Sequence, residues 1–309
     1  MASSPAPYLF IVGSPRTGST LLRHVLNRSP AVCLASETHF LKHSRRARLH
    51  RRLADAAAGD GDVRRTAVRD VVTELLKPRF WTWPSRNLEV DSLIDRVLAT
   101  DLSERALFSL LLDLYVERQC ADRAVAVRGE KTPDHLYQVA TLARWFPDAR
   151  FIHTFRDPRA IYASRLVRTG EGRRGMKARL PKVPARVLDP LLAPLEVVET
   201  SRVWLDAARL HRRHARELGE RYRLIRFEDL VADPRGVVTE ICAFVGIPFD
   251  EHLLDETVVV GSSFEEERHA AQGFDRRSVD RWRDHVHPLV KAWFGVIGRR
   301  ELRRFGYRP

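Results

Sequence analysis

An apolar run, a glycine-rich turn and an amphipathic segment follow one another near the start of this chain, and this order restricts the fold more than any other feature. Residues 8–13 (YLFIVG) have the composition of a buried parallel strand. The leucines and the valine of residues 21–26 recur at helical spacing. Between them stand the glycines and the threonine of a phosphate-binding loop, but Ser19 occupies the position where the pattern G-x-x-x-x-G-K-[ST] has lysine. The sequence therefore predicts an α/β fold in which a helix begins at an anion site.

The rest of the chain continues the alternation of strands and helices. Strands are predicted at about 124–128, at 149–155 (ARFIHTF) and at 222–227 (YRLIRF). Residues 38–122 have a helical pattern, and a long amphipathic helix is predicted over about 187–218. This alternation favours a P-loop-like, three-layer α/β/α architecture with a central parallel sheet and additional helices.

We expect one domain over residues 1–309, because the sequence has no internal repeat and no convincing linker. The helical insertion covers about 42–122, and the Gly-, Pro- and Arg-rich stretch at about 170–185 predicts a mobile surface loop. A break at 77–87 contains Trp81 and Trp83. This break is either a loop whose tryptophans are anchored in the core or a lid over the substrate.

Charge and cysteine usage restrict the partners and the compartment. The net charge of +13 favours anionic partners such as nucleotides, acidic glycans, nucleic acid or anionic lipid, although many arginines can simply be solvated. The sequence has no apolar run of membrane-spanning length, and the first apolar run is expected to be a strand, not a signal peptide. Cys33, Cys120 and Cys242 show neither metal-site spacing nor a framework of pairs. The expected location is therefore the cytoplasm, a reducing compartment.

Nucleoside-triphosphate hydrolysis is disfavoured by the same loop. It lacks the lysine that reaches the β and γ phosphates, and no apolar strand ends in an acidic residue suited to magnesium. Asp157 is followed by proline, which is typical of a helix cap.

Two motifs resemble the sulfotransferases that use 3'-phosphoadenosine 5'-phosphosulfate (PAPS). The stretch GSPRTGSTLL (13–22) is similar to the 5'-phosphosulfate loop of that family, and FRDPRAIYASRL (155–166) is similar to its 3'-phosphate segment. The stretches EKTPDHL and RFEDLVADP resemble the branch with a glutamate base, which includes tyrosylprotein sulfotransferases and many bacterial enzymes. The resemblance implies PAPS as cofactor and requires no metal.

The resemblance assigns the first phosphate to the 13–22 loop. Arg16 would neutralise charge on the 5'-phosphate as the bond between sulfur and the bridging oxygen breaks. A surface arginine outside the site is the alternative for Arg16. The backbone and hydroxyl donors to this phosphate would come from Thr17, Gly18, Ser19 and Thr20.

The second phosphate is assigned to Arg156 and Ser164, which match the family's 3'-phosphate pair. The alternative for Arg156 is a structural ion pair with Asp157 or with a neighbouring helix end. Arg159 and Arg165 are expected to be solvated or to face the acceptor.

Glu37 matches the position of the family's catalytic base, with His39 as the alternative. A partly buried carboxylate can have a raised pKa that suits this role. Lys131 matches a lysine that stabilises charge in the transition state, with Glu130 as a possible ion-pair partner; a solvated lysine is the alternative.

Residues 274–286 resemble, more loosely, a basic segment that closes over the nucleotide, although a solvated basic helix explains them nearly as well. Adenine is expected to stack on Trp83 or Phe227. The candidates in the basic segment are Arg276, Arg277, Ser278 and Arg281.

The predicted function is transfer of a sulfuryl group from PAPS to an acceptor hydroxyl on a small molecule, glycan or phenol. Residues 42–122 and 170–200 would shape the acceptor pocket. The competing hypotheses are a degenerate P-loop kinase and a non-catalytic basic protein that binds nucleotides or polyanions. We expect no nucleic-acid partner, because the basic residues are dispersed and no groove-reading motif is present. The sequence leaves the oligomeric state open.

Overall fold

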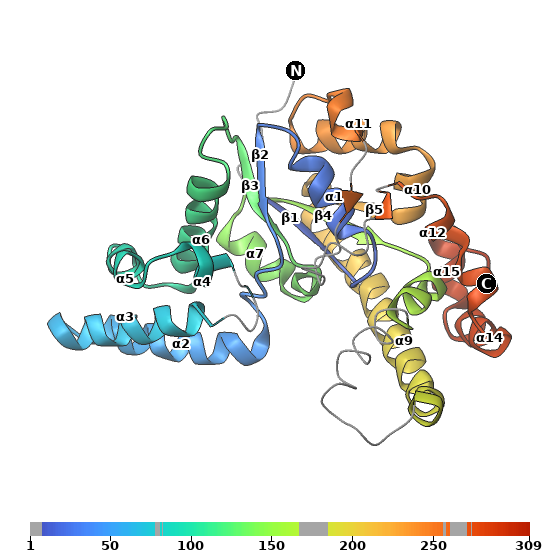
Figure 1. Ribbon diagram of the computed structural model, residues 1–309, viewed down its shortest axis with the longest axis horizontal. Helices are drawn as coiled ribbons and strands as arrows, with labels where there is room; N and C mark the ends of the chain where they lie inside the picture. Colours follow the sequence, from blue (N-terminus) through green and yellow to red (C-terminus); the bar gives the residue numbers. More distant parts are fainter. Residues whose placement is uncertain are drawn as a thin grey trace.

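The computed structural model describes residues 8–77, 81, 83–166, 185–255, 258–259, 271–272 and 274–309. A five-stranded sheet lies at its centre in the order β2-β3-β1-β4-β5, and all neighbouring strands are parallel (Figure 1). The strands are β1 (Tyr8–Gly13), β2 (Val32–Ala35), β3 (Val127–Lys131), β4 (Arg150–Phe155) and β5 (Tyr222–Arg226). The predicted central parallel sheet is therefore confirmed.

The register of the sheet brings the predicted motifs to one edge. On the two sides of β1, Ile11 pairs with Lys131 of β3, and Gly13 pairs with Thr154 of β4. Because all strands run in the same direction, the loops that follow β1, β3 and β4 leave the sheet side by side. Arg156 follows β4 directly, so it lies beside the loop that follows Gly13.

One face of the sheet is covered by the helix that follows β1 and by the helices that follow β5. Their apolar side chains pack on the alternate β1 residues Leu9 and Ile11, which are fully buried. This layer consists of α1 (Ser19–Leu26), α10 (Phe227–Ala232), α11 (Pro234–Val245) and the short η3 (Glu251–Leu254).

The opposite face packs against a second helical layer and a larger core. Three phenylalanines project from the strands into this core: Phe10, Phe151 and Phe155. Trp204, on the long helix of residues 185–218, belongs to the same core and is 1% exposed. The helices of this layer are α6 (Glu104–Gln119), η1 (Pro133–Gln138), α7 (Val139–Trp145), α9 (Ala185–Leu218) and α15 (Arg299–Arg304). The two layers and the sheet confirm the three-layer α/β/α prediction.

Four helices form an arm between β2 and α6, and its long pair extends away from the sheet (Figure 1). Trp81 lies in the arm's core with 4% exposure, and its ring centroid is 5.2 Å from that of Trp83 and 6.1 Å from that of Tyr115. These contacts favour a segment anchored in the core over a lid, and they place Trp83 here instead of at the phosphate loops. The arm consists of α2 (His43–Ala58), α3 (Gly61–Leu75), α4 (Trp83–Asn87) and α5 (Val90–Leu98).

A third, smaller core joins the helix at 158–166 to the C-terminal helices. Tyr162 contacts Phe294, with ring centroids 6.1 Å apart, and Trp282 is 7% exposed. The C-terminal elements are β6 (Val258–Val259), β7 (Ala271–Gln272), α12 (Arg277–Asp280), α13 (Trp282–His285) and α14 (Pro288–Ile297).

Three sequence predictions need comment. The strand expected at 124–128 is β3 and begins three residues later, at Val127. The four-residue strand β2 was not predicted, because so short a run carries no periodicity. The loop expected at about 170–185 lies outside the described residues, apart from Ala185, where α9 begins.

The cysteines also differ from the prediction. Cys33 of β2 and Cys120, which follows α6, form a disulfide with their Cα atoms 6.5 Å apart. The expectation that no cysteines pair is wrong for these two, because the chain returns to the edge of the sheet at a sequence separation of 87. Cys242 is a buried free thiol. None of the helices in the described ranges is long and apolar enough to cross a membrane.

Candidate functional site

The loop between β1 and α1 is held in a conformation with two left-handed residues. Arg16 has φ 74° and Gly18 has φ 84°. Thr17 closes the loop, because its Oγ1 donates to the carbonyl oxygen of Ser14 at 2.7 Å and lies 2.7 Å from Oγ1 of Thr154. A non-glycine residue at positive φ is uncommon and often marks a functional loop.

Glycine is required at position 18 by a neighbour as well as by its backbone angle. A Cβ atom added to Gly18 would lie 2.4 Å from Cδ2 of Phe227, at the start of α10. The first turn of α1 therefore packs directly on the Phe227 ring. This contact brings one of the two predicted adenine-stacking residues to the phosphate loop.

Hydrogen bonds join the two predicted phosphate segments. Nε of Arg16 donates to Oγ of Ser164 at 2.8 Å, across 148 residues of sequence. Nη1 of Arg156 donates to the backbone oxygen of Arg16 at 3.1 Å. The structure thus brings Arg16, Arg156 and Ser164 into one group, in which Arg16 is half-buried.

Arg156 is buried and incompletely satisfied. Its side chain lies 4.2 Å above the Phe227 ring, and Nη2 donates to the carbonyl oxygen of Ser278 at 2.5 Å. Nε is buried without a hydrogen-bond partner. Burial lowers the pKa of Arg156 to about 10, so the guanidinium remains charged at neutral pH. A buried cation with an unused donor is suited to an anion.

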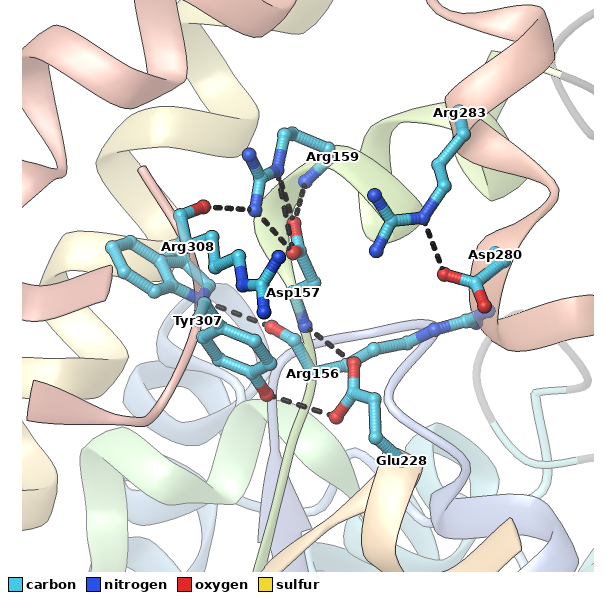
Figure 2. A network of polar contacts seen from close by, with 9 residues as sticks. Arg156, Asp157, Arg159, Glu228, Asp280, Arg283, Tyr307 and Arg308 are labelled. Atoms are coloured by element: carbon cyan, nitrogen blue, oxygen red, sulfur yellow. Dashed lines mark hydrogen bonds and ion pairs between the residues drawn. The ribbon is translucent and has the colours of Figure 1, made fainter. Parts of the chain in front are cut away.

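A network of buried side chains supports the segment that follows Arg156 (Figure 2). Arg159 donates to both carboxylate oxygens of Asp157, from Nε at 2.9 Å and from Nη2 at 2.7 Å. Asp157 also accepts from the backbone N–H of Arg159, which caps the helix at 158–166 as predicted. Arg159 is 6% exposed, so the expectation that it is solvated or faces the acceptor is wrong. Asp157 is thus paired with Arg159, and the alternative ion pair between Arg156 and Asp157 is not formed.

Glu228 connects this segment to the C-terminus (Figure 2). Its Oε1 accepts from the backbone N–H of Asp157 and its Oε2 accepts from the hydroxyl of Tyr307, both at 2.9 Å. Burial raises the pKa of Glu228. Trp204 donates from Nε1 to the carbonyl oxygen of Arg156 at 3.0 Å. The motif RFEDLVADP contains Glu228, but nothing in the sequence distinguishes it from its acidic neighbour, so sequence reasoning missed it.

The predicted base lies between two nitrogen groups. Nζ of Lys131 is 2.5 Å from Oε1 of Glu37, and Nε2 of His39 is 3.2 Å from Oε2. Lys131 is fully buried at the end of β3, so the alternative of a solvated lysine is excluded. Glu130 is not its ion-pair partner, because Glu130 contacts His135 instead.

The pKa of Glu37 differs from the expectation. Burial alone would raise it, but the hydrogen bond from His39 and the charge of Lys131 outweigh burial and lower the pKa to about 2. Burial also lowers the pKa of Lys131, and Glu37 opposes that effect. The expectation of a raised pKa is therefore wrong for this arrangement, in which Glu37 is an ionised proton acceptor of low basicity.

The basic segment near the C-terminus reaches the site mainly through its backbone. Ser278 supplies its carbonyl oxygen to Arg156, while its hydroxyl donates to Asp275 at 2.6 Å. Arg276 donates to the carbonyl of Ala232, and Arg281 pairs with Asp275 at 3.3 Å. The side chain of Arg277 lies outside the described residues.

Arg165 is the second arginine that was expected to be solvated or to face the acceptor. Its side chain is 23% exposed and pairs with Glu196 at 2.9 Å.

Among the residues that the structure describes, no group of three or more His, Cys, Asp or Glu side chains is placed to hold a metal ion.

Comparison with known proteins assigns the family. A model of the sulfotransferase family matches residues 7–251. The chain is 24% identical over 311 residues to protein-tyrosine sulfotransferase A of Caenorhabditis elegans, covering 98% of this chain and 68% of that protein. It is 32% identical over 148 residues to carbohydrate sulfotransferase 5 of Mus musculus, covering 43% of this chain and 37% of that protein. The chain belongs to the sulfotransferase family, which confirms the expected class of enzyme and its sulfuryl-transfer chemistry.

Solved structures confirm the fold. The sulfotransferase domain from the Synechococcus olefin synthase matches with a TM-score of 0.54 and 24% identity, covering 92% of this chain and 90% of that domain. The sulfotransferase domain from the curacin biosynthetic pathway matches with a TM-score of 0.57 and 20% identity, covering 99% of both chains.

Proposed function

We propose that this sulfotransferase uses PAPS at the joined 13–22 and 155–166 segments and transfers the sulfuryl group to an acceptor hydroxyl. One observation carries the proposal: the two loops that the sequence assigns to separate phosphates are in contact through the Arg16–Ser164 hydrogen bond. Two anion-binding loops at adjacent strand ends suit a nucleotide that carries a phosphate on each side of its ribose.

The residues present fit such a nucleotide. Arg156 Nε and Ser14 Oγ are both buried without hydrogen-bond partners, one in each segment. Gly18 lets the start of α1 lie against Phe227, and the helix N-terminus directs its amides and partial positive charge to the loop. Phe227, which already contacts Arg156, is the better of the two candidates for adenine because Trp83 lies in the arm.

In this proposal the donor supplies an activated sulfuryl group, whose bond to the 5'-phosphate breaks during transfer. Arg16 neutralises the charge that develops on that phosphate. Arg156 and Ser164 bind the 3'-phosphate. The other 5'-phosphate donors are Thr17, Gly18, Ser19 and Thr20, with Arg277 and Ser278 closing from the C-terminal segment.

Glu37 accepts the proton of the acceptor hydroxyl in this proposal. Its low pKa makes it a weak base toward a free alcohol, but a hydroxyl becomes acidic as its oxygen bonds to sulfur. Lys131 holds the carboxylate through the 2.5 Å contact and supplies positive charge beside the reacting group. His39 contacts the other carboxylate oxygen and is the alternative base.

Titration calorimetry with adenosine 3',5'-bisphosphate tests the cofactor assignment. The wild-type protein should bind it, and Arg156→Ala should weaken binding by about 10- to 100-fold, the equivalent of lost charge-assisted hydrogen bonds. Arg202→Ala, at an exposed position of α9, is the matched control and should bind normally. Absence of binding, or binding unchanged in Arg156→Ala, would sink the assignment.

We propose an acceptor hydroxyl on a small molecule, glycan or phenol. The support is limited to the chemical class: one similar protein is named for tyrosine and another for carbohydrate. Transfer of labelled sulfate onto a panel of phenols, sugars and aliphatic alcohols distinguishes these classes.

The cytoplasmic location stays a prediction, and the Cys33–Cys120 disulfide favours an oxidising compartment instead. Maleimide labelling of the denatured protein, taken from cells under acid quench and without reductant, decides between them. Labelling of Cys242 alone supports an oxidising compartment, whereas labelling of all three cysteines supports the cytoplasm.

A further inference from the structure

Two neighbouring helices expose large apolar side chains to solvent. On α14, the exposed fractions are 74% for Leu289, 43% for Trp293, 76% for Val296 and 36% for Ile297; on α9, they are 63% for Leu195 and 54% for Val198. These six residues form what we call the α9–α14 patch. Single exposed apolar residues need no explanation, but a group on two packed helices marks an interaction surface.

Trp293 connects the two helices that carry the patch. Its Nε1 donates to Oγ of Ser201 on α9 at 3.1 Å, one helical turn beyond Val198. The opposite face of α14 is buried, since Phe294 is 1% exposed and packs on Tyr162. Helix α14 is therefore held against the protein by one face while its other apolar face is directed outward. In Figure 1 it lies at the opposite end of the molecule from α2 and α3.

The chain beside the patch is strongly basic. Residues 283–309 contain seven Lys and Arg against two Asp and Glu. Arg299, Arg300 and Arg303 lie in α15, the helix after α14; they are exposed and form no ion pair within the part of the chain that the structure describes. Two copies meeting through this surface would bring like charges together, and the whole chain carries a net charge of +13. Charge therefore disfavours a second copy and favours an anionic surface.

We propose that the α9–α14 patch docks this enzyme on an anionic lipid surface, with α14 lying in the plane of the interface. The exposed leucine, valine and isoleucine side chains enter the boundary between headgroups and acyl chains, and Trp293 occupies the headgroup level. The arginines after α14 contact the anionic headgroups. This inference is independent of the acceptor and of the nucleotide assignment.

Sedimentation of the full-length protein with vesicles tests the proposal. The protein should bind vesicles of equal parts phosphatidylglycerol and phosphatidylcholine, and bind pure phosphatidylcholine vesicles at least about tenfold more weakly. The double substitution Leu289→Ser/Val296→Ser should weaken binding to the anionic vesicles by at least about tenfold, because two large side chains no longer enter the apolar layer. The matched control is Val63→Ser on α3, which is 66% exposed and should bind like the wild type.

Two further measurements keep the result interpretable. Thermal unfolding should be unchanged in the double variant, which separates lost docking from lost folding. Tryptophan emission should shift to shorter wavelength on binding, and Trp293→Phe should remove most of that shift. Equal binding by the double variant and the wild type, equal binding to both vesicle types, or no binding to either would overturn the proposal. So would concentration-dependent dimerisation that the double substitution abolishes, without vesicle binding, because it would assign the patch to a second copy.

Discussion

Lys131 is fully buried at the end of β3 and places its ammonium nitrogen 2.5 Å from the carboxylate of Glu37. A buried ammonium group without a partner is costly, so this contact holds both side chains in position. Because Lys131 is fixed at the end of β3, beside Ile11 of β1, it also fixes the position of the Glu37 carboxylate. The pair thus determines the location and the charge of the proposed base.

We expect Glu37→Gln to slow sulfuryl transfer by about 10²- to 10⁴-fold, the usual contribution of a general base. His39→Gln should slow it by less than about tenfold. Steady-state rates with a reactive acceptor measure both effects. Calorimetry should show that adenosine 3',5'-bisphosphate binds both variants as tightly as the wild type. Retained transfer by Glu37→Gln, combined with loss in His39→Gln, would make His39 the base.

Replacing the buried cation should change the pH dependence of the reaction. In Lys131→Met the carboxylate stays partly buried but loses its cation, so the pKa of Glu37 should rise from about 2. The acidic limb of the kcat/KM profile should then move to higher pH, and the rate at its plateau should fall by about 10- to 1000-fold. Lys77→Met, in the helical arm, is the control. An acidic limb at the wild-type position would show that Lys131 does not control this carboxylate.

Gly18→Ala should destabilise the protein more than the backbone angle alone requires. A left-handed residue other than glycine costs roughly 1–2 kcal/mol, and the clash with Phe227 adds about 1–3 kcal/mol. Gly61 is a matched control, because it also has positive φ but would bring its new Cβ within 4 Å of nothing. Urea unfolding of the two alanine variants measures the difference. Equal losses of stability would show that Phe227 yields freely to the added methyl group.

Three histidines between α9 and the sheet should make the fold sensitive to acid. The rings of His153 and His211 are 6.0 Å apart, and Nδ1 of His153 lies 2.6 Å from the hydroxyl of Tyr222. Burial lowers the pKa of His153, His211 and His214, that of His211 to about 4. As the pH drops below 6.5, these histidines are protonated in the unfolded chain before they are protonated in the folded chain. The free energy of unfolding should therefore fall as the pH drops from 6.5 to about 4.

Urea unfolding at several pH values measures this linkage. His211→Gln should lower the slope of stability against pH in that range by about one proton. His285→Gln, at an exposed position of α13, should leave the slope unchanged. A slope that His211→Gln does not alter would contradict the proposed linkage.

The meeting of the two phosphate segments could be predicted from the sequence because both follow strands of one parallel sheet. Each strand, its loop and its helix are encoded within about 20 residues, and parallel strands end at the same edge. The grouping of Arg16, Arg156 and Ser164 was expected only from the resemblance to the family, and the neighbouring positions of β1 and β4 in the sheet give its physical reason.

The pairing of charged side chains could not be predicted in the same way. Lys131 and Glu37 are 94 residues apart and meet only because β3 and the segment after β2 are neighbours, while β2 itself is too short to be recognised. Arg159 was expected to be solvated or to face the acceptor. In the structure it is buried, and the carbonyl oxygen of Arg308, near the C-terminus, accepts a hydrogen bond from its side chain. Such pairings depend on which distant segments cover a site, and local sequence patterns carry no such information.

The disulfide between Cys33 and Cys120 has a consequence for the covalent topology of the molecule. It closes a loop that contains Glu37, His39, the entire helical arm (α2 to α5) and α6. A protease that cuts once within the arm would leave two fragments joined as one molecule, with the proposed base still attached to the edge of the sheet. Such a nicked enzyme would run as a single band until reductant is added.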